Sequence, residues 1–347
     1  MNQKSKKHTR SSNNLRIGVA GFFGYGNPGD ELILHNFLEL HKKDQITIFN
    51  PDQTDQIPGS DIQVLYFPGG GIFHDLWIQK HFPKKIIEKI DIPMLLLAAG
   101  IPHGENKTLI SHRISYFVRK LKFIGVRDPV SKQIFQSLWD LPVHLIPDLA
   151  FLTPKLQAKR STILLQKKRR ISSNYKQLTP KNYREITDQL NQKISEEFKT
   201  KSLEWNSFKA AIKEISQAKF LISQSLHAGI IAITQQTPFS AIQYQGKILH
   251  VLSMVADSKR IFYPTGDLDP ARILPFCFQP LEKWKLKRIQ QFLKDITQKI
   301  HHSIEENSLE DLKIIELLFS PTKKESYSYG REYGKPHRRI INFLRNI

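Results

Sequence analysis

Residues 15–41 read LRIGVAGFFGYGNPGDELILHNFLELH, and this stretch decides the fold class. Its first six residues form a mainly apolar run with β-branched members, which favours a buried strand. A glycine-rich segment follows, after which Ile33, Phe37 and Leu40 recur at helical spacing. The order of strand, glycine-rich turn and helix predicts the first unit of a parallel α/β sheet.

The same alternation continues along the chain. Further strands are predicted at 45–49, 64–67, 94–99, 123–126 and 143–146, with a helix at about 107–120. Beyond Pro154 the pattern predicts strands at 162–165, 202–205, 220–223 and 239–243, and helices at about 182–198, 208–217 and 228–235. We therefore predict an α/β protein with two Rossmann-like domains and helices near its C-terminal end.

The predicted organisation has four parts. A length of 347 residues suits two domains, and 40% hydrophobic residues exclude disorder of the whole chain. The parts are a disordered basic tail at 1–14, a Rossmann-like domain at 15–153, a smaller one at 154–262, and a helical segment with a basic tail at 263–347.

The formal net charge of +20 is concentrated in a few places. Segments 1–14, 155–170 and 320–347 together supply 16 of these charges. Two interpretations are open. The segments are either solvated basic tails, or they attract an acidic partner such as anionic lipid, nucleic acid or a phosphorylated substrate.

Cysteine content and hydropathy bear on the compartment. A single cysteine, Cys277, allows no intramolecular disulfide and no cysteine-based metal site, so a reducing compartment is expected. The basic N-terminal stretch is followed by no apolar segment typical of a signal peptide. Residues 220–246 lack acidic and basic side chains, but polar residues interrupt the roughly 20 apolar residues that a spanning helix needs. We expect a cytoplasmic protein, with peripheral attachment at the inner face of the membrane as an option.

The glycine-rich loop at 24–29 matches the spacing G-x-G-x-x-G. A dinucleotide pyrophosphate at the following helix start is disfavoured, because Asp30 and Glu31 already occupy the first turn. One interpretation is a tight turn with Asp30 as the N-cap of the helix. The other is an open loop, including Gly26 and Asn27, whose carboxylates line a cleft and accept protons from a polyol.

Two further strand ends carry candidate site residues. Gly69, Gly70 and Gly71 directly follow a strand, which favours close approach of a ligand or of another backbone, although a permissive turn is the alternative. Arg127 also stands at a strand end, where a guanidinium can fork onto a carboxylate or phosphate. A simple pair between Arg127 and Asp128 is the alternative.

His227 lies at a predicted junction of strand and helix, with Ala228 and Gly229 beside it. A helix N-terminus favours neutral imidazole, so this side chain is a candidate acid or base. Lys247 comes just past the next strand, so we expect it at the same sheet edge. A structural role for His227 is the alternative.

An ordered set of motifs resembles the polysaccharide pyruvyl transferase family. The segments are GYGNPGDELIL (24–34), GGGIFHD (69–75), AAGIPHG (98–104), GVRDPVS (125–131), PDLAF (147–151), SLHAGIIA (225–232) and TPFSAIQYQGK (237–247). They spread over about 225 residues, in the family's order.

The resemblance implies a fold similar to that of GT-B glycosyltransferases, with an active site between the two domains. In such enzymes phosphoenolpyruvate is the donor co-substrate and its pyruvyl group bridges two hydroxyls of a sugar or lipid-linked glycan as a ketal; no further cofactor and no metal are implied. Arg127 and Lys247 would bind the donor, and His227 would protonate it. The hydroxyl proton would go to Asp30, Asp75 or Asp148.

Some positions depart from the family pattern, namely Ser225, Gln245 and Gly246. An altered donor or acceptor, or a degenerate site, therefore stays open. Two other interpretations also stay open: a GT-B-type glycosyltransferase that uses a nucleotide sugar, and a non-catalytic basic binding protein. Specific nucleic-acid binding is not expected, because aromatic residues accompany the cations only in the C-terminal tail. The sequence indicates neither the acceptor sugar nor the oligomeric state.

Overall fold

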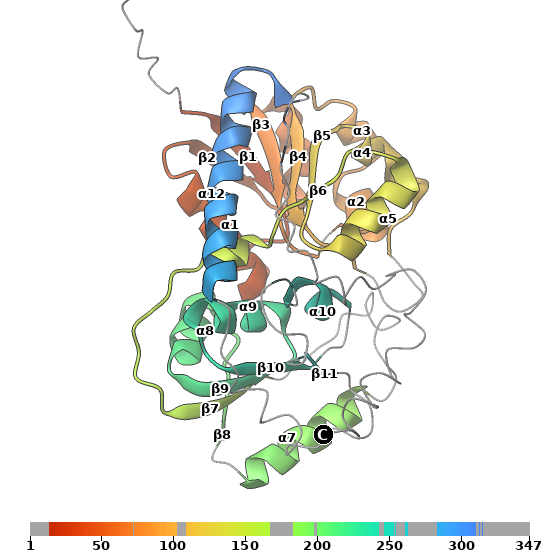
Figure 1. Ribbon diagram of the computed structural model, residues 1–347. Coiled ribbons are helices and arrows are strands. Elements are labelled where there is room, and N and C mark those ends of the chain that lie inside the picture. Colours follow the sequence, from red (N-terminus) through yellow and green to blue (C-terminus); the bar gives the residue numbers. More distant parts are fainter. Residues whose placement is uncertain are drawn as a thin grey trace, which may run out of the picture.

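The computed structural model describes residues 14–71, 73–102, 109–166, 183–197, 200–242, 246–252, 254, 261–262, 283–309, 312 and 314. Two parallel sheets organise these residues (Figure 1). The predicted α/β class with two sheets is therefore confirmed. The predicted basic tails at both ends lie almost wholly outside the described residues.

The first sheet has six parallel strands in the order β2-β1-β3-β4-β5-β6. Apolar runs of β-branched and aromatic residues form them, and every residue of β3 and β4 is buried, as expected for a sheet covered on both faces. The strands are β1 (Arg16–Ala20), β2 (Gln45–Phe49), β3 (Val64–Pro68), β4 (Met94–Ala99), β5 (Leu121–Val126) and β6 (His144–Leu145).

Short helices connect these strands. Asn27 caps α1 by accepting a hydrogen bond from the Gly29 N–H, and Pro28 is its first residue. The interpretation of Asp30 as the N-cap is therefore wrong. The α-helices are α1 (Pro28–Leu40), α2 (Asp75–His81), α3 (Lys84–Ile87), α4 (Ser115–Val118) and α5 (Pro129–Trp139), and the 3₁₀ helices are η1 (Pro51–Gly59), η2 (His112–Ile114) and η3 (Leu149–Leu152).

The helix expected at about 107–120 is shorter than predicted. In its described part the chain forms η2 and then α4, with Ser111 capping η2 by accepting a hydrogen bond from the Arg113 N–H. The apolar spacing was correct, since Ile114, Phe117 and Val118 are buried, but it is satisfied by two short turns rather than one long helix.

The second sheet has five parallel strands in the order β11-β10-β9-β7-β8. The chain reaches it from η3 through residues 153–161, where the sequence predicts the domain boundary. The strands are β7 (Thr162–Gln166), β8 (Thr200–Ser202), β9 (Ala218–Ser223), β10 (Phe239–Ile242) and β11 (Ile261–Phe262), and the helices are α7 (Tyr183–Glu197), α8 (Phe208–Ser216), α9 (Leu226–Gln235) and α10 (Gly246–Leu252).

Both sheets share one topology. Taken in chain order, each has its first strand between the second and the third, so the connection reverses direction at β1/β3 and again at β7/β9. Such switch points open a crevice at the carboxyl ends of the strands, where α/β proteins bind ligands. The glycine-rich loops after β1 and β3 lie at the first switch point, and α9 follows the second.

A long helix, α12 (Lys283–Glu305), packs across the boundary between the sheets. Figure 1 shows it running from beside α8 and α9 along the first sheet. Gln290 Nε2 donates to the Phe151 carbonyl at 2.9 Å, and His301 Nε2 lies 3.0 Å from Asp44 Oδ1. His41 Nδ1 lies 2.9 Å from the other Asp44 oxygen, so one buried carboxylate ties α12 to the first sheet.

The apolar core does not divide between the two sheets. One cluster covers one face of the first sheet, around Phe67 and Phe117. The other joins the opposite face to the second sheet and α12 without interruption. Its members include Val19, Tyr66, Ile222, Ile230 and Ile289.

Candidate functional site

Six residues that follow six different strands come together where the carboxyl ends of the two sheets meet. Each of them stands just beyond its strand, in a loop or in the first turn of a helix, as the parallel topology requires. They are Asp30 after β1, Gly71 after β3, Arg127 after β5, Asp148 after β6, His227 after β9 and Lys247 after β10.

Arg127 and Asp148 form a fully buried ion pair. Arg127 Nη1 donates to Asp148 Oδ2 at 2.7 Å, and the two side chains are 2% and 0% exposed. Asp128 is not the partner of Arg127, because its carboxylate caps α5 through the Ser131 N–H and hydroxyl. The alternative of an Arg127–Asp128 pair is therefore wrong.

The other edge of the Arg127 guanidinium lies buried against Gly100. Its Nε has no hydrogen-bond partner among the described residues, although the residue is only 1% exposed. A Cβ placed on Gly100 would lie 2.7 Å from Nη2 and 2.8 Å from Cζ of Arg127. Glycine at position 100 thus lets the guanidinium pack directly against the backbone. The edge formed by Nε and Nη2 of a guanidinium presents two parallel N–H donors, the geometry that binds carboxylate or phosphate.

His227 is the second residue of α9 and is held between the two sheets. Its Nε2 lies 3.7 Å from Asp148 Oδ2, which is too long for a hydrogen bond but close enough for an ion pair when the ring is charged. The ring also lies directly against the start of α1, because a Cβ on Gly29 would lie only 2.6 Å from its Cε1. This close approach requires glycine at position 29.

The two buried carboxylates have opposite pKa shifts. Burial raises the pKa of Asp30, and the positive charges of His227, Lys247 and Arg127 only partly oppose this. Burial would also raise the pKa of Asp148, but His227 and the Arg127 guanidinium outweigh it and hold that pKa well below its usual range. Two carboxylates with pKa values driven apart suit different roles, one as a fixed anion and one as a proton acceptor.

Lys247 brings a second cation to the same place. It is the second residue of α10 and is half-buried. A Cβ on Gly71 would lie 3.9 Å from Lys247 Nζ and 4.0 Å from Arg127 Nη2, so both cations face the glycine loop after β3. The expectation that Lys247 shares a sheet edge with His227 is confirmed.

Three other residues predicted for the site lie around the charged cluster. Asn27 donates a hydrogen bond from Nδ2 to the Asp30 carboxylate, and the Gly70 carbonyl accepts from Gly100 N–H at 2.9 Å. Glu31 Oε1 accepts from Gly24 N–H at 2.6 Å and so fixes the loop.

Two predicted residues lie apart from the cluster of charges. Both oxygens of the Asp75 carboxylate bind Ser111, at its N–H and at its hydroxyl. Gly26 adopts φ +70° in the loop, and a Cβ added there would meet no atom within 4 Å, so this glycine shapes the loop without contact to the charged residues. Their proposed substrate contacts stay predictions.

Sequence reasoning missed Gly29 and Gly100 as site residues. Gly29 follows Pro28 at the helix start, and Gly100 directly follows the buried run 94–99. A glycine immediately after a parallel strand, or in the first turn of the next helix, is the signal that would have found both, because ligands and opposing side chains approach at that edge.

A comparison with protein families identifies the chain. The family described as polysaccharide pyruvyl transferase matches residues 27–246, which is more than half of the sequence. This chain belongs to the polysaccharide pyruvyl transferase family. The matched region contains every member of the charged cluster except Lys247, which immediately follows it. No curated protein matches the sequence.

A comparison with solved structures finds similar folds, one of them with a TM-score above 0.5. UDP-GlcNAc 2-epimerase from Methanocaldococcus jannaschii is similar with a TM-score of 0.52 at 7% identity, over 82% of this chain and 100% of that chain. An uncharacterised protein from Klebsiella pneumoniae is 17% identical over 69% of this chain and 88% of its own, with a TM-score of 0.41. The pyruvyl transferase family member thus has a GT-B-type architecture of two facing α/β sheets.

No helix in the described part of the chain is both long and apolar enough to cross a membrane. Within the same ranges, no three His, Cys, Asp or Glu side chains are grouped so as to hold a metal ion.

Proposed function

We propose that this protein transfers the pyruvyl group of phosphoenolpyruvate onto two hydroxyls of a sugar in a polysaccharide or cell-envelope glycan precursor, forming a ketal. One observation carries the proposal: two cations, an imidazole and a carboxylate of raised pKa converge on one small space between the sheets. The donor carries a carboxylate and a phosphate close together, so it requires convergent cations.

The donor anion binds to the free edge of Arg127. Asp148 holds Nη1, and Nη2 lies on the side of Gly71, where a Cβ would be 4.0 Å from it. Lys247 adds a point charge beside the same glycine, with Nζ 3.9 Å from where its Cβ would be. A fork for one anionic group and an ammonium for the other match the donor's two charges.

His227 supplies the proton that activates the donor. Its imidazolium protonates the methylene carbon, which becomes a methyl group, and C2 becomes electrophilic as the enol double bond is lost. The negative charge of Asp148, 3.7 Å from Nε2, stabilises the imidazolium before the transfer. The ring is then neutral and ready to act as a base in the second half of the reaction.

Asp30 is the carboxylate that we assign to the first hydroxyl. Its pKa is raised by burial, whereas Asp148 is held as a fixed anion by Arg127 and Asp75 is bound to Ser111. The hydroxyl oxygen bonds to C2 and its proton passes to Asp30. The C2–O bond to phosphate then breaks, and phosphate leaves with that proton. The second hydroxyl closes the ketal and returns its proton to His227.

The decisive experiment is incubation of the purified protein with phosphoenolpyruvate and free or lipid-linked sugars, measuring phosphate release and the ketal methyl signal by NMR. We expect His227→Gln to lower kcat by about 10²- to 10⁴-fold, since general acid–base catalysis contributes that much. His302→Gln, on an exposed part of α12, is the matched control and should stay within about twofold. Equal turnover in both variants would contradict the assignment. Turnover of a nucleotide sugar without use of phosphoenolpyruvate would support a glycosyltransferase instead.

Asp30→Asn tests the proton acceptor separately from the fold. We expect kcat to fall by about 10²-fold or more, because the amide accepts no proton. A carboxyl with a raised pKa loses stability as the pH rises through that value, so at pH near 7 the variant should be as stable as the parent or more stable. Thermal unfolding measured beside kcat checks both statements. A destabilised variant with normal kcat would refute the role.

We propose that the protein acts at the inner face of the cytoplasmic membrane, because its expected acceptor is a sugar or a lipid-linked glycan. Lys155, Lys159 and Arg160 are exposed in the passage between the sheets, which belongs to the basic segment 155–170. Clusters of basic residues attract anionic lipid headgroups. Co-sedimentation with vesicles of anionic and of neutral lipid tests this. Salt-sensitive binding to the anionic vesicles alone is expected, and no binding would exclude the membrane as a partner.

A further inference from the structure

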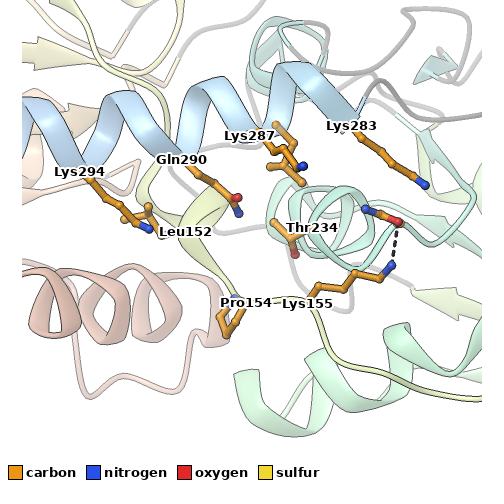
Figure 2. Close-up of a pocket in the computed structure, with 10 residues that line it drawn as sticks. Leu152, Pro154, Lys155, Thr234, Lys283, Lys287, Gln290 and Lys294 are labelled. Carbon is orange, nitrogen blue, oxygen red and sulfur yellow. Dashed lines mark hydrogen bonds between the residues drawn. The ribbon is translucent and has the colours of Figure 1, made fainter.

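A cavity of about 560 Å³ lies beside the end of η3. Helix α12, the chain between the two sheets, and the last turn of α9 form its walls (Figure 2). The residues that line it are Leu152, Pro154, Lys155, Thr234, Gln236, Lys283, Leu286, Lys287, Gln290 and Lys294. Neither the family match nor the proposed reaction assigns a role to it.

Four of these ten residues are lysines, and none is acidic. Lys283, Lys287 and Lys294 project from one face of α12, as Figure 2 shows, and form no ion pair with any residue in the described ranges. Over 11 residues this row of ammonium groups extends for about 16 Å along the helix. Lys155 faces it from the opposite wall, held by Gln236 Oε1 at 2.8 Å. The cavity is therefore a concentrated positive field with no internal counter-ion.

The end of α9 would weaken this field if its carbonyls were free, because a helix C-terminus carries partial negative charge. Arg160 removes that effect. Its Nη2 donates to the carbonyl of Gln235 at 3.3 Å and to that of Gln236 at 2.5 Å. The last carbonyls of α9 are thus occupied by a cation outside the lining of the cavity, and the lysines remain available to a ligand.

The shape and the chemistry of the lining specify the ligand. The volume lies within the roughly 300–1,000 Å³ of small-molecule sites, and a concave pocket suits a small ligand better than a flat bilayer surface. Lysine is a point-charge binder of phosphate, and several spaced lysines match several phosphoryl groups. Gln290 uses Nε2 on the Phe151 carbonyl, which leaves its Oε1 as an acceptor for a ligand hydroxyl.

We propose that this cavity is a second binding site, specific for a ligand with a diphosphate group. Thr234 on its wall is seven residues along α9 from His227, or roughly 10 Å, so the site is separate from the donor site. Nucleotides and lipid-linked glycans both carry a diphosphate. The lysines recognise this shared group.

Titration calorimetry at constant ionic strength tests the proposal with three probes: inorganic pyrophosphate, a nucleoside diphosphate and farnesyl diphosphate in detergent. We expect saturable binding of pyrophosphate with a Kd below about 1 mM, and tighter binding of whichever larger probe resembles the natural ligand. The double variant Lys283→Gln/Lys287→Gln should weaken binding by about tenfold or more, because charge-assisted contacts are lost.

Two controls make the result unambiguous. Lys299→Gln, exposed on α12 but not part of the cavity lining, should bind pyrophosphate within about twofold of the parent. Lys247→Met should also bind it normally and lose only turnover of phosphoenolpyruvate. Absence of saturable binding, or binding that Lys247→Met abolishes and the double variant retains, would overturn the proposal. Failure of the pyruvyl transfer reaction would leave this result unaffected.

Discussion

The two ends of helix α9 differ in how the protein handles charge. At its start, His227 faces the buried pair of Arg127 and Asp148, where each charge has an opposite charge nearby. At its end, the cavity beside Gln236 is lined by four lysines and no acid. The first arrangement is buried and compensated within the protein, and the second is exposed and uncompensated.

The difference follows from the cost of desolvation. A buried charge must be paired, because moving it out of water costs several kcal/mol. An exposed lysine stays hydrated and needs no partner within the protein, so it can bind an anion from solution. The formal charge of +20 is therefore not concentrated in the charged cluster, where Arg127 and Lys247 are balanced by Asp30 and Asp148. Excess positive charge lies instead on α12 and in the basic segments.

Arg127→Ala should have the largest effect of these variants. It leaves Asp148 buried without its cation, so we expect the free energy of unfolding to fall by about 3–5 kcal/mol. Lys287→Ala, on α12 in the lining of the cavity, should change the free energy of unfolding by less than about 0.5 kcal/mol, because this side chain is exposed. Urea unfolding of both variants measures the contrast. Similar losses in the two would show that burial does not separate the sites.

Gly29→Ala should come next in size. The new Cβ would overlap the His227 ring, whose Cε1 would be 2.6 Å away, so the ring must leave its position against α1. We expect kcat to fall by about 10²-fold, as small displacements of a catalytic group do, which corresponds to about 2.7 kcal/mol in the barrier. Gly59→Ala is the control, since this exposed glycine lies outside the site and its added Cβ would meet no atom within 4 Å. A normal kcat for Gly29→Ala would show that the position of His227 is not critical.

We expect a smaller effect from replacing Asp44, whose buried carboxylate contacts both His41 and His301. Burial raises its pKa, but hydrogen bonds with His41, His301 and the Leu15 N–H prevail and lower it to about 2. A lowered carboxyl pKa stabilises the fold above the usual value near 4, and this contribution is lost as the pH falls toward 2. Asp44→Asn should therefore cost about 1–2 kcal/mol at neutral pH. Its unfolding free energy should also depend less on pH between about 4 and 2. Parallel pH profiles for the variant and the parent would contradict this.

The sequence predicted the central strands well because they are buried on both faces. The range 94–99 is predicted correctly at both ends, since its continuous apolar run has few other structures available. The range 45–49 is also correct, although β2 is an edge strand with three exposed residues; its β-branched residues and the following Asn50-Pro51 carried that prediction. The helix at 107–120 was less well predicted, because short 3₁₀ turns satisfy the same apolar spacing.

The site was predictable in its members but not in its pairings. The rule that parallel strands end at one edge brought His227 and Lys247 together, and the family resemblance added Arg127. That rule says nothing about partners, so the neighbour Asp128 was as plausible for Arg127 as Asp148, which is 21 residues away. The cavity was missed for a related reason: the lysines of α12 are indistinguishable in sequence from an ordinary solvated helix face.

The core shared by both sheets and α12 has a consequence for the order in which the protein is made. On the ribosome the first sheet is complete when residue 145 has been synthesised, yet only α1 then packs on the apolar face that includes Val19 and Tyr66. The members of this core in α9 and α12 are added only by residues 235 and 305. The nascent chain therefore exposes an unfinished apolar surface for about 160 residues, or roughly 8–30 s at usual elongation rates, and this interval is where a chaperone would be needed.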